Sequence, residues 1–375
     1  MFKRHGRAVA LLAALTLILA ACTSSDDGGS SETTAGETET TAAASSGGSV
    51  LAAVQDRGKL NCGVNNGVPG FGFVDESGEH VGFDIDYCKA VAAAVLGDAD
   101  AVEYVDLDAQ QRFTALQSGE IDVLIRNTTW TATRDGSEGA TFLHTTFYDG
   151  QGMMVKADAG IASLDDMANT SVCVQSGTTT ELNLASRFDE GGIPYTPLTF
   201  AENPQIQEAF IAGQCEGWTS DKSQLAGLRS NWPEDQGGPE ALVILDETFS
   251  KEPLGPVVRD GDSQWAQIID WITLATITAE ELGIDSSNVG SFGDTESTEI
   301  RRLLGLEITG DDGATSVFDP GLGLEPGWVV DVISAVGNYG EIFDRNLGSD
   351  TPLGLTRGVN ALWTDGGLLY APPYR

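Results

Sequence analysis

The amino-acid sequence predicts an α/β protein, because short β-branched runs alternate with segments of helical length. Strand-like runs occupy residues 59–64, 102–105 and 121–125, and helix-like segments at 85–96 and 112–118 lie between them. This alternation is typical of βαβ units and predicts a mostly parallel sheet. A chain of 375 residues is also long enough for two domains with buried cores.

The remaining elements continue this alternation. Two short strand pieces are expected at 71–73 and 81–83, and Asp84 is predicted to cap the helix that follows. A second α/β unit begins near residue 153. Its predicted strands are 153–155, 171–175, 195–200 and 215–219, its helices begin at 179, 204 and 223, and strands 243–245 and 256–258 carry the chain back. Three further helices are predicted at 265–282, 299–304 and 327–336.

The N-terminal residues are predicted to be a targeting segment. Lys3, Arg4 and Arg7 precede an apolar run at 8–21 that is too short to span a membrane but typical of a secretory signal peptide. The run ends in Leu19-Ala20-Ala21-Cys22, which resembles a bacterial lipobox. That resemblance implies a lipidated Cys22 after removal of residues 1–21. The alternative is a signal peptide without lipidation and an incidental cysteine.

Residues 22–49 are expected to form a flexible tether. From 23 to 49 the chain holds Ser, Thr, Gly, Ala and acids, with no aromatic or large aliphatic residue that could build a core. No later stretch has the length of an apolar membrane helix. We therefore expect membrane contact only through the N-terminal lipid.

The charge balance excludes some partners. Lys and Arg total 20 while Asp and Glu total 56, which gives a net charge of −36. Nucleic acid and anionic lipid both require basic patches, so neither is expected as a partner. A metal site is not expected either, because only His80 and His144 remain once the signal peptide is removed.

Residues 121–134 carry the most informative motif. The buried strand expected at 121–125 is followed by hydroxyl and amide side chains, and Arg134 closes the run. Open α/β sheets bind ligands beyond the carboxyl ends of their strands, and a guanidinium there fits a carboxylate bidentately. The alternative is an edge loop whose arginine pairs with a surface acid.

This motif resembles the signature of family 3 solute-binding proteins of polar amino-acid ABC importers, especially the general L-amino-acid-binding subgroup. The resemblance rests on Arg126-Asn127-Thr128-Thr129-Trp130-Thr131 with Arg134. It extends to Gly63-Val64-Asn65 with Pro69-Gly70-Phe71, Gly82-Phe83-Asp84-Ile85-Asp86, Gly177-Thr178-Thr179-Thr180-Glu181-Leu182-Asn183-Leu184 and Gly337-Asn338-Tyr339-Gly340-Glu341-Ile342-Phe343.

The resemblance implies a periplasmic-binding-protein-like (type II) fold, with two α/β lobes joined by a two-crossing hinge. The lobes would divide into residues 50–152 for the first part of lobe 1, 153–250 for lobe 2, and 251–375 for the return to lobe 1 with C-terminal helices.

The four cysteines beyond Cys22 are then expected to form two disulfides, since export leads to an oxidising compartment. Three pairings are possible. We predict Cys62–Cys88 and Cys173–Cys215, because bonds within each lobe leave the lobes free to move.

An L-amino acid needs a cationic donor and an anion within one ligand's length. Arg134, with Asn127 and Thr129, is predicted to bind the carboxylate. Thr179 opens a helix after a glycine turn and would add backbone N–H donors, although an ordinary threonine cap is the alternative. By resemblance, Asp221 would bind the ammonium; the alternative is another capping acid.

The side-chain wall is predicted less specifically. Asn65, Val68, Phe71 and Trp130 are candidates, while the alternative for apolar and aromatic residues is plain core. Where related proteins carry an aromatic residue in the first loop, this chain has Asn66-Gly67-Val68. This loop therefore offers no aromatic ring that could stack on the ligand.

No catalytic function and no cofactor are expected. The sequence lacks a Gly-x-Ser-x-Gly elbow, a Walker loop and a nucleophile beside a histidine. The expected partners are an L-amino acid, an ABC permease and its ATPase, and the protein is expected to be a monomer on the outer face of the cytoplasmic membrane or in the periplasm. Two rivals stay open: a two-lobed enzyme of the cyclohexadienyl dehydratase type, and an amino-acid sensor.

Overall fold

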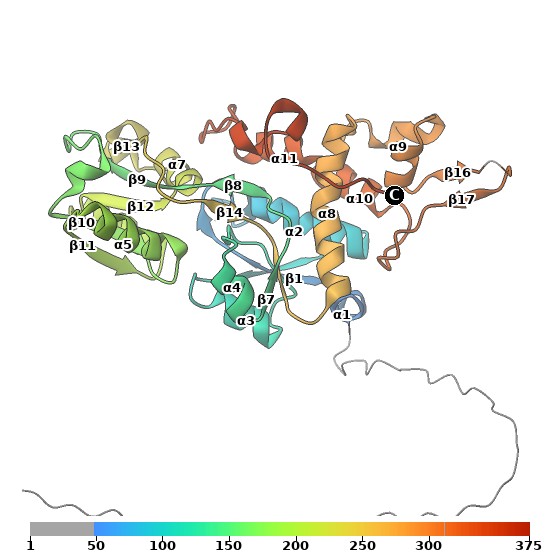
Figure 1. The fold of residues 1–375 in the computed structure, drawn as a ribbon, viewed down its shortest axis with the longest axis horizontal. Helices are drawn as coiled ribbons and strands as arrows, with labels where there is room; N and C mark the ends of the chain where they lie inside the picture. The colour runs from blue at the N-terminus through green and yellow to red at the C-terminus, as the bar shows by residue number, and fades with distance from the viewer. Residues whose placement is uncertain (1–48, 311) are drawn as a thin grey trace, which may run out of the picture. The chain divides into compact units, whose positions relative to one another are not determined.

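Two five-stranded sheets form the framework of the protein (Figure 1). The computed structural model describes residues 49–310 and 312–375, and residues 47–375 form one compact unit. The predicted signal peptide, Cys22 and all but the last residue of the tether lie outside the described residues. No helix among the described residues is long and apolar enough to cross a membrane.

The first sheet has the order β5-β1-β6-β15-β7. Its strands are β5 (Val102–Asp106), β1 (Leu60–Val64), β6 (Val123–Leu124), β15 (Val257–Arg259) and β7 (Ala140–Phe142). Strand β1 pairs in parallel with β5 and β6, whereas β15 is antiparallel to β6 and β7. Four of the five strands therefore run in one direction and β15 is the reversed one, so the prediction of a mostly parallel sheet is confirmed apart from β15. Strand β15 joins the sheet after the chain has returned from the second sheet, and it runs in the opposite direction.

The second sheet has the same plan, with the order β11-β10-β12-β9-β13. Its strands are β11 (Tyr195–Phe200), β10 (Thr170–Gln175), β12 (Gly217–Asp221), β9 (Gln151–Lys156) and β13 (Leu242–Ile244). The first three are parallel and β9 is antiparallel to both of its neighbours. The carboxyl ends of β10 and β12 therefore lie at one edge of the sheet.

Two paired strands connect the sheets. β8 (Phe147–Asp149) leads out of the first sheet, β14 (Glu252–Leu254) leads back, and they pair antiparallel with Phe147 opposite Leu254 (Figure 1). The chain thus crosses twice between the sheets, and the crossings are hydrogen-bonded to each other.

The largest core lies against the first sheet. Helices α2 (Phe83–Leu96), α8 (Ser263–Glu281) and α10 (Trp328–Val336) pack together there, and α1 (Val50–Arg57) and α11 (Tyr339–Asn346) join them. The C-terminal helices α10 and α11 therefore belong to the core of the first sheet and do not form a separate core.

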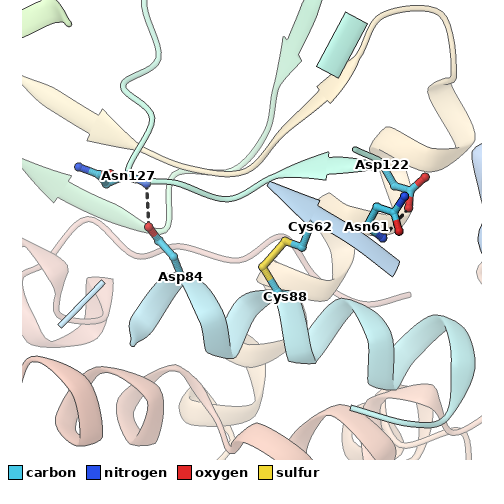
Figure 2. The surroundings of a disulfide bond; sticks show 6 residues. All are labelled: Asn61, Cys62, Asp84, Cys88, Asp122 and Asn127. Carbon is cyan, nitrogen blue, oxygen red and sulfur yellow. Dashed lines mark hydrogen bonds between the residues drawn. A yellow bond between two sulfur atoms is a disulfide. The ribbon is translucent and has the colours of Figure 1, made fainter. Parts of the chain in front are cut away.

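Helix α2 corrects one expectation. Its cap residue is Gly82, at φ 130°, and Asp84 makes no cap hydrogen bond. A side chain on Gly82 would collide with the backbone of Phe71 at 2.2 Å, so glycine is required there. The Asp84 carboxylate instead accepts the backbone N–H of Asn127 at 2.7 Å (Figure 2). Asp84 therefore holds the backbone of the predicted binding loop at Asn127.

The other elements are short. They comprise α3 (Arg112–Ser118), α4 (Ala132–Ser137), α5 (Thr179–Gly191), α6 (Asn203–Ile211), α7 (Lys222–Ser230), α9 (Thr298–Leu303), the hairpin of β16 (Glu307–Thr309) and β17 (Thr315–Val317), and the sheet of β2 (Gly67–Val68), β3 (Gly72–Val74) and β4 (His80–Val81). Helices α1, α4 and α11, strands β2, β7, β8 and β14, and the hairpin of β16 and β17 were not predicted from the sequence.

Both predicted disulfides are confirmed. Cys62 on β1 bonds to Cys88 on α2, and Cys173 on β10 bonds to Cys215 just before β12 (Figure 2 shows the first). Each bond stays within the elements of one sheet, so neither restrains the two crossings.

Candidate ligand-binding site

Five of the predicted binding residues line one small cavity: Arg134, Asn127, Thr129, Thr179 and Asp221. The first three follow β6 of the first sheet; in the second sheet, Thr179 follows β10 and Asp221 is the last residue of β12. The remaining residues on the wall are Arg112, Arg126, Gln175, Thr178, Thr180, Ser220 and Gln224. The cavity therefore lies where strand ends of both sheets meet.

Arg134 is held in place by its own helix. It lies in α4, whose first residue follows the cap residue Thr131, and the Thr131 hydroxyl accepts the Arg134 backbone N–H at 3.2 Å. The guanidinium Nη1 donates to the Thr129 carbonyl at 3.0 Å, and the residue is 9% exposed. Burial lowers the pKa of Arg134, while Glu252 and Asp221 oppose that shift. A ligand carboxylate would supply the missing countercharge on the cavity wall.

Asn127 adopts an unusual backbone conformation, with φ 36°. This left-handed turn directs its amide toward the other sheet: Nδ2 donates to Gln224 Oε1 at 3.1 Å and lies 3.5 Å from Asp221 Oδ2. Its Oδ1 accepts from Asn65 Nδ2 at 3.3 Å. The strain is tolerated because the Asp84 carboxylate holds the Asn127 backbone N–H.

Thr129 and Thr179 face each other across the cavity, with hydroxyl oxygens 3.3 Å apart. Thr179 begins α5, and the cap of that helix is the preceding Thr178, which accepts the Glu181 N–H at 3.1 Å. The Thr179 hydroxyl also donates to Glu252 on β14 at 2.8 Å. The capping alternative thus applies to Thr178, which leaves Thr179 on the cavity wall.

Asp221 is the last residue of β12 and is 5% exposed. Burial raises its pKa well above the usual range, and Asp149 and Glu252 raise it further, whereas Asn127 and Arg134 lower it. A cation bound beside this carboxylate would favour its ionised form.

Two predicted residues lie outside this cavity. Trp130 is 43% exposed and stacks on Phe142 with the two rings nearly parallel. Asn65 lines a neighbouring cavity, which shares Arg126 with the first. Of the weaker candidates, Val68 and Phe71 belong to the main core.

Sequence reasoning assigned no role to Arg112 or Gln224. Arg112 opens α3, just after the loop that follows β5, and Gln224 lies one turn beyond Asp221 in α7. The position of Arg112 after a strand end was a usable signal, because strands of one sheet deliver their following residues to one edge.

The cavity wall thus combines buried guanidinium groups, hydroxyls and one carboxylate. Among the described residues, no group of three or more metal-ligating side chains occurs. A guanidinium and a carboxylate facing one space suit a small zwitterion that carries an anion and a cation close together.

The fold and this site together define a class of protein. A solved structure described as an ABC transporter / periplasmic binding protein from Brucella ovis with glutathione bound matches with a TM-score of 0.81 and 46% identity, covering 87% of this chain and 99% of that one. The fold is accordingly the type II periplasmic-binding-protein fold, with two α/β lobes joined by a two-crossing hinge. We call the part built on the first sheet lobe 1 and the part built on the second sheet lobe 2.

The family follows from the sequence comparisons. Residues 60–283 match the bacterial extracellular solute-binding proteins, family 3, and the chain belongs to this family. It is 47% identical to the general L-amino acid-binding periplasmic protein AapJ of Rhizobium johnstonii, over 87% of this chain and 93% of that protein. It is 48% identical to the glutamate/glutamine/aspartate/asparagine-binding protein BztA of Rhodobacter capsulatus, over 87% and 94%. These relatives are binding proteins, so the chain is a solute-binding protein and not an enzyme.

Proposed function

We propose that this protein is an extracytoplasmic receptor that captures L-amino acids between its lobes and delivers them to an ABC importer. The observation that carries the proposal is that Arg134 of lobe 1 and Asp221 of lobe 2 line one cavity. In this assignment, Arg134, Asn127 and Thr129 bind the ligand carboxylate, Thr179 adds a hydroxyl from lobe 2, and Asp221 binds the ammonium.

Charge matching explains why the ligand must be a zwitterion. Burying an ionised group without a partner costs several kcal/mol, so a ligand that lacked either charge would leave Arg134 or Asp221 unmatched. The two charges also orient the ligand Cα. The remaining substituent then points in one direction only, which favours the L-enantiomer.

Ligand capture requires movement of the lobes. The Thr129–Thr179 and Asn127–Gln224 contacts join lobe 1 to lobe 2 beside the cavity. A ligand bound to both lobes shifts the equilibrium toward this closed arrangement, because only there are both ligand charges paired.

Transport requires an importer and a location beside it. We infer that lipidated Cys22 anchors the protein, as a monomer, to the outer face of the cytoplasmic membrane, that residues 23–49 act as the tether, and that a permease with its ATPase accepts the ligand. Metabolic labelling with a fatty acid should mark the wild-type protein and fail to mark Cys22→Ser. Equal labelling of both would remove the anchor from the proposal.

Isothermal titration calorimetry on residues 47–375 tests the binding function. The protein is unfolded, dialysed and refolded first to remove any co-purified ligand, and a panel of L-amino acids is titrated with D-enantiomers as controls. Micromolar or tighter binding of several L-forms, with the D-forms rejected, is expected. Absence of binding across the panel would overturn the proposal.

A second ligand class is favoured by one observation. A groove adjoins the cavity and shares Arg134, Thr178 and Thr179 with it. The Brucella ovis relative has glutathione bound. The glutamyl residue of glutathione keeps a free carboxylate and ammonium on one carbon, so it presents the same head group. Glutathione therefore belongs in the titration panel.

Because the chain is a solute-binding protein and not an enzyme, the sensor is the rival that remains to be tested. Amino-acid uptake by cells that is lost on deletion of this protein supports transport over sensing.

A further inference from the structure

Arg112 is a buried cation with few partners. It begins α3 in lobe 1, is 3% exposed and lines the same cavity as Arg134 and Asp221. Its hydrogen bonding to the described residues is limited to a long contact of 3.4 Å from Nη2 to the Gly177 carbonyl, and its buried Nε has no partner there. A guanidinium carries five N–H donors, so most of its donor capacity is free for a ligand.

The cavity wall has an excess of cations. Arg112, Arg126 and Arg134 all line it, and none of them makes an ion pair with any described residue. Arg126 is partly satisfied, since its Nε donates to the Leu107 carbonyl at 2.7 Å. The wall offers one carboxylate, Asp221, and a ligand ammonium would pair with that group. The α-carboxylate of one ligand would then offset one guanidinium of three.

The other buried acids nearby do not remove this excess. The Glu252 carboxylate accepts from Thr179 and Asn183, and it lies off the cavity wall. Asp84 and Asp149 are also off the wall, and burial raises their pKa values to about 7 and about 6.

Arg112 and Arg134 are also neighbours of one ring. Their guanidinium carbons lie 5.4 Å and 5.7 Å from the centroid of the Phe113 ring. The two guanidinium groups therefore lie near one ring, and both line the same cavity, where each can bind an anion. Arg134 binds the ligand α-carboxylate in the proposed function.

We propose that Arg112 is a second carboxylate subsite, which makes acidic L-amino acids, glutamate and aspartate, the preferred ligands of this receptor. This inference rests on the proposed function, because it takes the amino-acid head to bind between Arg134 and Asp221. The side-chain carboxylate receives the free N–H donors of Arg112 as a charge-assisted, bidentate pair. A basic side chain at this position would instead add a cation beside three guanidinium groups and is disfavoured.

The test compares L-glutamate with L-glutamine, two ligands of nearly the same shape that differ in charge. Both are titrated calorimetrically into wild type, Arg112→Met and Arg112→Lys. Wild type is expected to bind glutamate at least about 10-fold more tightly than glutamine. Arg112→Met should lower the glutamate affinity about 30-fold or more, the usual cost of removing one partner of a buried charge pair, and change the glutamine affinity less than about 3-fold.

The controls separate this inference from the proposed function and from a folding defect. Arg112→Lys keeps the positive charge but loses the planar guanidinium, so it should retain part of the preference for glutamate over glutamine. If Arg112→Met fails to fold, the comparison of the two ligands is made with Arg112→Lys instead. Equal binding of the two ligands by wild type, or equal weakening of both by Arg112→Met, would overturn the inference and leave the receptor function standing. Absence of any amino-acid binding by wild type would overturn both.

Discussion

Asn127 of lobe 1 and Gln224 of lobe 2 are joined by a hydrogen bond of 3.1 Å from Nδ2 to Oε1. The same amide lies 3.5 Å from the Asp221 carboxylate. Asn127 and Gln224 are nearly one hundred positions apart in the sequence but meet beside the cavity. The Asn127 side chain thus connects the predicted carboxylate-binding loop to Asp221, the predicted ammonium-binding acid. Binding and closure are therefore expected to respond together when either end of the site is changed.

Arg134→Ala should reduce the affinity for L-amino acids at least about 30-fold, because the ligand carboxylate would be buried without its cationic partner. Trp130→Ala is the matched control from the same loop. Its ring stacks on Phe142 outside the cavity, so a change of less than about 3-fold is expected. Calorimetry on both variants checks this, and normal affinity in Arg134→Ala would remove the assigned role.

Asp221→Asn separates binding from stability. Loss of the carboxylate should weaken ligand binding at least about 30-fold, since the ammonium loses its countercharge. The ligand-free protein should unfold at an equal or higher temperature, because the substitution removes a buried charge next to Asp149 and Glu252. Thermal unfolding with and without ligand measures both effects. Full affinity in this variant would contradict the ammonium role.

Ligand affinity should fall as the pH is lowered. In the ligand-free protein the pKa of Asp221 is raised by burial and by neighbouring acids, so lowering the pH neutralises this group earlier than an ordinary aspartate. A bound ammonium favours the ionised carboxylate, so binding should release a proton at mildly acidic pH. Titrations in two buffers with different ionisation enthalpies report this proton. Identical heats in both buffers would argue against the linkage.

Asp84 predicts a pH dependence of stability with a defined sign. Burial raises its pKa from 3.8 to about 7, so the folded state holds the proton more tightly than the unfolded chain. The contribution of the Asp84 protonation to the free energy of unfolding is fully present below about pH 4 and is lost as the pH rises through about 7. The unfolding temperature of wild type should therefore fall more between pH 4 and 7 than that of Asp84→Asn. Parallel curves for the two proteins would contradict this assignment.

The disulfides should stabilise each lobe separately. Cys173 and Cys215 are 42 residues apart in sequence, and closing a loop of that size stabilises the folded state by about 2–4 kcal/mol. Replacing both with Ala should lower the free energy of unfolding by that amount in urea titrations, without changing ligand affinity. The Cys62–Cys88 pair, 26 residues apart, is the comparison within lobe 1.

Much of the fold was predictable, because local patterns determine it. Helix α3 begins and ends at the predicted residues, and β11 has the predicted bounds. Most of the elements that were missed are short. Strand β14 has three residues and helix α4 has six, and segments of that length carry too little periodicity to be recognised. Strand β14 pairs with β8, and α4 packs against β7.

The site was predictable only in part. Arg134, Thr129 and Asp221 were found through a motif and a resemblance, and the structure places them on one cavity. Trp130 belongs to the same motif but lies outside the cavity, because its ring packs on Phe142. A motif specifies which residues follow a strand; the direction of each side chain depends on the backbone turn and on its packing neighbours.

The sequence by itself determined the α/β alternation and the family, both of which depend on local patterns and motifs, while the pairing of the cysteines was settled by the structure. Only the tertiary structure decided which charges share a cavity. Arg112 lies far from Asp221 in the chain, and although it follows a strand end, the sequence does not show that it is buried on the wall of the same cavity. Its burial and its unpaired donors result from closure of two lobes around one space, and an arrangement built from distant segments has no signature in any one of them.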